Sequence, residues 1–142
     1  MMAKLELSRI AALTVLVFLG GCAFVSHDQS VEALLANADT RTSFQVAAVP
    51  GQACPKAARM LSWCAGGPNF HYRCNISQDG GRAELVGILE AIYRTEYFMV
   101  TEFVRGGSDS TVTVHQHDGV LIYDYAPMIE KYFGNTGSCQ PR

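Results

Sequence analysis

The 142-residue sequence lacks the features that would assign a reaction directly. Its 11 Lys and Arg residues are all separated from one another, so no basic patch for nucleic acid is predicted. There is no Gly-x-Ser-x-Gly elbow for a nucleophile, and the carboxylates are scattered singly along the chain. We therefore expect a non-catalytic protein with no cofactor and no nucleic-acid partner.

Long apolar runs are also scarce, and the one that stands out is near the N-terminus. Residues 10–19 are apolar except for Thr14, and they follow the basic residues Lys4 and Arg9. Ten residues form a helix only about 15 Å long, which is too short to cross about 30 Å of hydrocarbon. A basic start, a short apolar run and small residues at its end are typical of a secretory signal peptide. We assign residues 1–21 to this signal.

The segment Leu19-Gly20-Gly21-Cys22 resembles the lipobox of bacterial lipoproteins. In that family the cysteine thiol receives a diacylglyceryl group, cleavage occurs just before it, and the new N-terminus is acylated. The resemblance implies that Cys22 is the lipidated first residue of the mature protein. The next residue, Ala23, is not aspartate, which under enterobacterial sorting rules implies the outer membrane, facing the periplasm. The membrane, through this lipid, and another envelope protein are the expected partners.

The other four cysteines are Cys54, Cys64, Cys74 and Cys139, and they contain no CxxC pair. An even number in a small exported domain predicts two disulfides, with a zinc site as the alternative. A helix ending at Cys64 separates Cys54 from Cys64 by about 15 Å, whereas a disulfide needs Cα atoms within about 7 Å. A strand running back along that helix returns Cys74 to the level of Cys54. We therefore predict the pairs Cys54–Cys74 and Cys64–Cys139.

The spacing of apolar residues predicts a single α+β domain over residues 43–142, preceded by a lipidated tether and a short helix over residues 22–42. The predicted order is β-α-β-β-β-β-α, in which an antiparallel sheet of four to five strands carries helices on one face as a two-layer domain. This order also resembles small proteobacterial envelope lipoproteins of unassigned function. Strands are expected at residues 43–49, 69–76, 83–89, 96–104 and 110–117 with a further short one at 120–123, and helices at 30–36, 54–64 and 127–133.

Two of these segments leave alternatives open. Residues 83–93 fit both helical and strand spacing, and the turn at Asp79-Gly80-Gly81 favours a strand that forms a hairpin. Residues 96–104 have apolar side chains on both faces. This pattern indicates either a central strand buried on both sides or an exposed apolar patch for a partner.

Strand alternation gives the predicted sheet one polar face, which we interpret as exposed and as the place where a partner binds. It would carry Asn69, His71, Arg73, Thr111, Thr113, His115 and His117. Three of these residues, His71, His115 and His117, could together hold zinc or copper, although strand alternation alone also explains polar residues there.

The favoured function is a lipid-anchored envelope module that binds another protein or stabilises an assembly. One alternative is a ligand-binding or enzyme-inhibitor lipoprotein with a pocket lined by Met60, Leu61, Met99 and Phe103. The other is a metal-binding protein that uses the three histidines.

Overall fold

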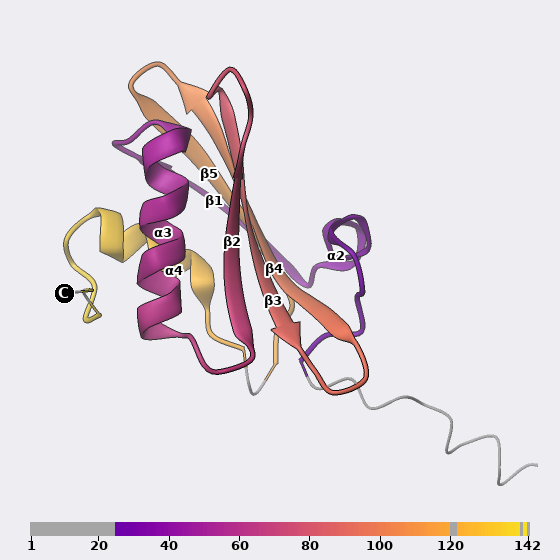
Figure 1. Ribbon diagram of the computed structural model, residues 1–142. Coiled ribbons are helices and arrows are strands. Elements are labelled where there is room, and N and C mark those ends of the chain that lie inside the picture. Colours follow the sequence, from indigo (N-terminus) through magenta and orange to yellow (C-terminus); the bar gives the residue numbers. More distant parts are fainter. Residues whose placement is uncertain (1–24, 120–121, 140, 142) are drawn as a thin grey trace, which may run out of the picture.

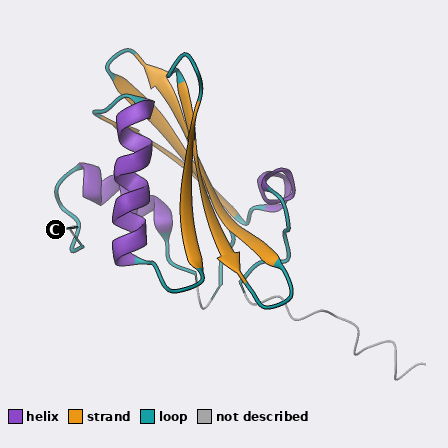
Figure 2. Cartoon of the chain, in the orientation of Figure 1, coloured by secondary structure: helices purple, strands orange, loops and turns teal. Residues whose placement is uncertain are grey.

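The computed structural model describes residues 25–119, 122–139 and 141, and in these ranges the chain forms an α+β domain, as predicted (Figures 1 and 2). The proposed signal peptide and Cys22 lie outside the described residues, as does half of the strand expected at 120–123. The elements are α2 (Val31–Asn37), β1 (Thr40–Val46), α3 (Pro50–Cys64), β2 (Phe70–Ile76), β3 (Arg82–Glu90), β4 (Thr95–Gly106), β5 (Asp109–Gln116) and α4 (Tyr125–Phe133).

The five strands form one antiparallel sheet in the order β1-β5-β4-β3-β2. Strands β2 to β5 follow one another through hairpins, while α3 carries the chain from β1 at one edge to β2 at the other (Figure 1). β4 is therefore the central strand. Its Val100 and its Phe103 lie in separate apolar clusters on the two faces of the sheet, so the interpretation of residues 96–104 as a central strand is confirmed.

Helices α3 and α4, the two helices of the predicted order, cover the same face of the sheet (Figure 2). The core between these layers contains an aromatic group in which Phe98 stacks on Tyr125, with ring centroids 5.6 Å apart. Gly87 on β3 makes room for it, because a Cβ at that position would come within 2.6 Å of the Phe98 ring. This close packing explains why a glycine occupies the middle of a strand.

Both disulfides in the structure join the predicted partners. Cys54 of α3 is bonded to Cys74 of β2, with Cα atoms 5.9 Å apart. Cys64, at the other end of α3, is bonded to Cys139 beyond α4, with Cα atoms 6.0 Å apart. The two ends of α3 are thus fixed to β2 and to the C-terminal segment, respectively.

The first turn of α3 begins earlier than expected. The helix starts at Pro50, four residues before the predicted start, and Pro55 lies inside it. Proline suits a first helical position because its missing N–H would have no helical partner there. β1 also lies three residues closer to the N-terminus than expected, because its pairing with β5 runs from Thr40 opposite Gln116 to Val46 opposite Ser110.

The short helix α2 packs on the opposite face of the sheet from α3 and α4 (Figure 1). Ser30 caps it by accepting a hydrogen bond from the backbone N–H of Ala33. Its Leu34 is fully buried against Val86, Ile88 and Val100 of β3 and β4. A helix that was assigned to the tether region is therefore part of the folded domain.

Candidate functional site

The residues of the expected polar face do share one face of the sheet, but only part of that face is exposed. Thr111, Thr113 and His115 of β5 lie on the side of the sheet away from α3, and strand pairing places Arg73 of β2 on that side as well. Helix α2 and the segment 25–29 cover one half of this face. We name the uncovered half the polar half-face, formed by Ser43, Gln45, Arg73, Asn75, Arg82, Glu84, Glu102, Thr111 and Thr113.

The prediction that His115 and His117 are exposed is wrong. Their exposed fractions are 6% and 4%, because the N-terminal part of the domain folds over the end of β5 that carries them. His115 places Nε2 3.0 Å from a carboxylate oxygen of Glu102, so this histidine has a partner within the sheet. The polar alternation of a strand specifies which face a side chain occupies but not what covers that face.

The three histidines considered as a metal site do not converge. His71 is on edge strand β2 and His115 is on β5, three strands away, which corresponds to about 14 Å at the usual strand spacing. His71 instead lies 3.4 Å from Glu90. The structure therefore separates His71 from His115 and His117.

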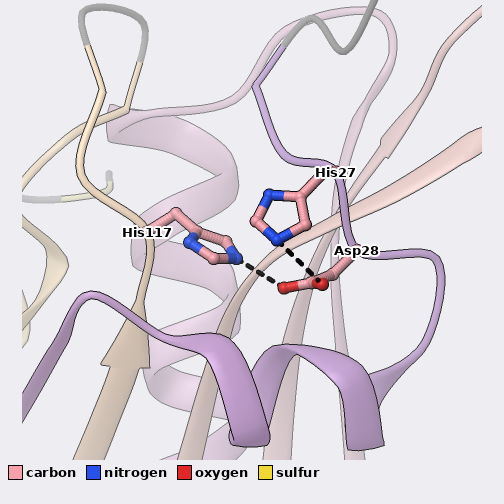
Figure 3. A group of neighbouring side chains, drawn as sticks. All are labelled: His27, Asp28 and His117. Atoms are coloured by element: carbon pink, nitrogen blue, oxygen red, sulfur yellow. Dashed lines mark hydrogen bonds and ion pairs between the residues drawn. The ribbon is translucent and has the colours of Figure 1, made fainter. Parts of the chain in front are cut away.

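His117, just beyond β5, lies between Asp28 and Asp39, two aspartates from segments far away in the sequence. Figure 3 shows its contact with Asp28. Its Nε2 is 2.5 Å from Oδ2 of Asp28, and its Nδ1 is 3.0 Å from Oδ2 of Asp39. Only the imidazolium form has an N–H on both ring nitrogens and can donate to both carboxylates. Burial lowers the pKa of His117, but the two hydrogen bonds and the two negative charges outweigh burial and raise that pKa overall.

Asp28 is itself buried, with 3% of its surface exposed. Its Oδ1 accepts a hydrogen bond of 3.0 Å from the side-chain amide of Asn37 and lies 3.4 Å from Nε2 of His27. Burial works to raise the pKa of Asp28, but the hydrogen bonds from His117 and Asn37 and the nearby histidine charges hold it below its usual value. The carboxylate is therefore ionised and fixed in orientation on both oxygens.

Asp39, by contrast, is half-exposed and holds the outer side of His117. The same oxygen that faces His117 accepts the backbone N–H of Asp118 at 2.9 Å. This backbone hydrogen bond, followed by the one from His117, lowers the pKa of Asp39. Asp39, His117 and Asp28 thus form a chain of hydrogen bonds, in which Asp39 fixes the orientation of the His117 ring and the ring contacts Asp28.

A second set of contacts fastens the same N-terminal segment. Glu96, with no exposed surface, accepts hydrogen bonds from the backbone N–H groups of Val25 at 2.7 Å and Ser26 at 3.0 Å. Arg94 pairs with the other oxygen of Glu96 at 3.1 Å and also donates to the carbonyl of Ser26 at 3.1 Å. The chain expected to be a free tether up to residue 29 is thus bound to the domain from Val25 onward. We name these contacts, together with the Asp28–His117 pair, the N-terminal clamp.

The side chains proposed to line an apolar ligand pocket are packed in the core instead. Met60, Leu61, Met99 and Phe103 are each at most 1% exposed. An open hollow of about 370 Å³ lies at the end of β2, β3 and β4 remote from α2. Of the four predicted pocket residues only Phe103 belongs to its lining, together with Asn75, Ile76, Ser77, Arg82, Ala83, Glu84, Glu102 and Val104. Its lining mixes charged side chains with apolar ones such as Ile76 and Val104, and it is open to solvent, so it suits a contact with a protein better than an enclosed site for an apolar molecule.

Comparison of this chain with protein-family models, with curated proteins and with solved structures finds no match. None of the helices in the described ranges has the length and apolar character needed to cross a membrane. The site is therefore interpreted from its own geometry.

Proposed function

We propose that this protein is a lipid-anchored, non-catalytic module of the cell envelope that binds another envelope protein. The observation that carries the proposal is the N-terminal clamp, which binds the chain only three residues after Cys22. A domain that holds the base of its own tether with buried charged groups is suited to presenting one surface in a defined orientation to the membrane. The lipobox-like segment supplies the anchor in this proposal.

The polar half-face is the surface we assign to the partner. Side-chain hydrogen bonds between strands order it: Ser43 and Thr113 are 3.0 Å apart, and Gln45 donates to Thr111 at 2.8 Å. Because these side chains are already ordered, this surface loses less conformational entropy when a partner binds than a mobile loop would lose.

The same surface contains an unfavourable pair of charges that favours a cationic partner. Glu84 and Glu102 lie directly opposite each other on β3 and β4. Burial, followed by the negative charge of Glu102, raises the pKa of Glu84. Like charges in opposite positions destabilise a sheet. Lys or Arg side chains of a partner would relieve this repulsion, so we assign a partner with a cationic contact surface.

The anchor is tested by Cys22→Ser in the full chain. We expect the variant to leave the membrane fraction or to accumulate as the uncleaved precursor, because a serine hydroxyl cannot take the thioether-linked lipid. Membrane fractionation and intact mass measure the two outcomes. An unchanged fractionation together with an unchanged mass contradicts the lipid anchor.

The partner surface is tested by a charge added at Gln45, with the same change at Gln52 as the matched control. Both glutamines are exposed, but Gln45 lies on the polar half-face and Gln52 lies on α3. Since exposed substitutions usually change stability by no more than about 0.5 kcal/mol, both variants should keep the wild-type melting temperature. We expect Gln45→Lys to reduce partner recovery about tenfold after crosslinking in intact envelopes, and Gln52→Lys to leave it unchanged. Equal recovery with the two variants would place the partner elsewhere.

A further inference from the structure

The inner end of the N-terminal clamp brings together three side chains that transition metals bind well. The ligand atoms of His27, Asp28 and His117 all lie within 4.8 Å of one another, and their side chains point toward a common centre (Figure 3). We propose that these three residues form a binding site for a divalent transition metal, with Zn²⁺ as the best fit. This proposal is independent of the lipid anchor and of the partner surface, and it differs from the histidine set expected from the sequence.

The donor set is selective in its chemistry. Two imidazole nitrogens and one carboxylate oxygen are ligands typical of zinc sites that keep a fourth position for water. Ca²⁺ and Mg²⁺ prefer sites made of oxygen atoms, so they fit this set poorly. His27 has 66% of its side chain exposed, which leaves a path from solvent to the centre and room for a water ligand.

The groups behind the ligands are already in place. Asp39 is bonded to Nδ1 of His117, which directs the other nitrogen, Nε2, toward Asp28. Such a carboxylate behind a histidine is the usual outer partner of a zinc-binding imidazole. Asn37 donates to Asp28 and fixes the plane of its carboxylate. Two of the three ligands are thus buried and oriented before a metal arrives.

The distances require only a small adjustment. Two ligand atoms bound to one tetrahedral zinc at about 2.0–2.1 Å lie about 3.4 Å apart. Nε2 of His27 is 3.4 Å from Oδ1 of Asp28, the oxygen that does not face His117, and one ligand atom from each of the three residues lies within 4.8 Å of the other two. Nε2 of His117 is 2.5 Å from Oδ2 of Asp28, and this pair would open by about 1 Å as the metal takes the place of the proton between them.

A metal held in this way would replace the Asp28–His117 hydrogen bond of the N-terminal clamp with coordination bonds and add His27 to the clamp. His27 and Asp28 belong to the segment that leads to the proposed anchor, whereas His117 directly follows the last residue of β5. The ion would therefore join the base of the tether to β5 by coordination bonds. A ligand that binds only the folded state also raises the melting temperature in proportion to the logarithm of its concentration.

The test uses the full-length protein in detergent micelles, freed of metal with a chelator and titrated with ZnCl₂. We expect one Zn²⁺ per chain by equilibrium dialysis and a higher melting temperature with zinc than without. Co²⁺ in place of Zn²⁺ should give the visible absorption bands of a tetrahedral site. The variant His27→Ala removes an exposed ligand, and we expect it to weaken zinc binding at least tenfold without changing the melting temperature of the metal-free protein.

Two further variants separate a site from adventitious binding. His71→Ala removes a histidine that also lies 3.4 Å from a carboxylate, but on the far edge of the sheet, and should bind zinc like the wild type. Asp39→Ala leaves all three ligands and should weaken binding by about 10–100-fold, as loss of an outer partner does. The proposal is overturned if zinc does not bind at one per chain, or if His27→Ala and His71→Ala bind it equally.

Discussion

Loss of the Cys64–Cys139 disulfide, through Cys64→Ala together with Cys139→Ala, is expected to lower the free energy of unfolding by roughly 4 kcal/mol. The bond joins residues 75 positions apart, so its removal releases most of the domain from a closed loop in the unfolded state. The chain-entropy model predicts a larger effect for such a loop than for the 20-residue separation of Cys54 and Cys74. Urea unfolding of the purified protein under oxidising conditions measures the difference.

A reducing agent provides the control for this experiment. With both disulfides reduced, the variant and the wild type should unfold at urea concentrations that differ far less than under oxidising conditions. A variant that is as stable as the wild type while Cys54 and Cys74 remain bonded would show that the C-terminal segment contributes little to the fold.

The second large effect is expected from Glu96→Ala, which should destabilise the protein by about 3 kcal/mol. The substitution removes the acceptor of two backbone N–H groups and leaves the Arg94 guanidinium, only 21% exposed, without its carboxylate. The cost falls at the lower end of the range for a broken buried ion pair because Arg94 can still reach water. Equilibrium unfolding measures the total, and hydrogen exchange at Val25 and Ser26 reports the release of the segment itself.

Glu90→Ala is the matched control for Glu96→Ala. Glu90 also pairs with an arginine, Arg73, at 3.3 Å, but both side chains are more than half exposed. Exposed pairs contribute at most about 1 kcal/mol, so this variant should unfold close to the wild type and keep residues 25–28 protected from exchange. Equal effects of the two substitutions would mean that the N-terminal clamp does not hold the segment.

Local patterns in the sequence were sufficient for most of the fold. The alternation of residues 110–117 placed His115 and His117 on the correct face of the sheet, because side-chain direction in a strand depends only on position. In the same way, the fixed rise per residue of a helix was enough to predict that Cys54 and Cys64 are too far apart to form a disulfide. Both arguments concern residues close together in the chain, where the geometry of the backbone decides the outcome.

The N-terminal clamp was not predictable in this way. His117 meets Asp28 across 89 positions of sequence, and Glu96 meets Ser26 across 70. The sequence shows that α2 has an apolar side. It does not show that this side packs on β3 and β4, on the face of the sheet opposite α3. The strand over residues 96–104 carries two carboxylates, Glu96 and Glu102, and the sequence does not show that Glu96 alone is buried and therefore needs a partner.

In the lipidated protein that we propose, the N-terminal clamp also limits how far the domain can move from Cys22. A free chain from Cys22 to Ser30 could extend about 28 Å, whereas the three steps from Cys22 to Val25 allow only about 10 Å. With the lipid that we propose at Cys22, the volume swept by the domain shrinks roughly twentyfold, since volume scales with the cube of this reach. A partner would then meet the domain at a higher effective concentration, but only within about one domain diameter of the bilayer surface.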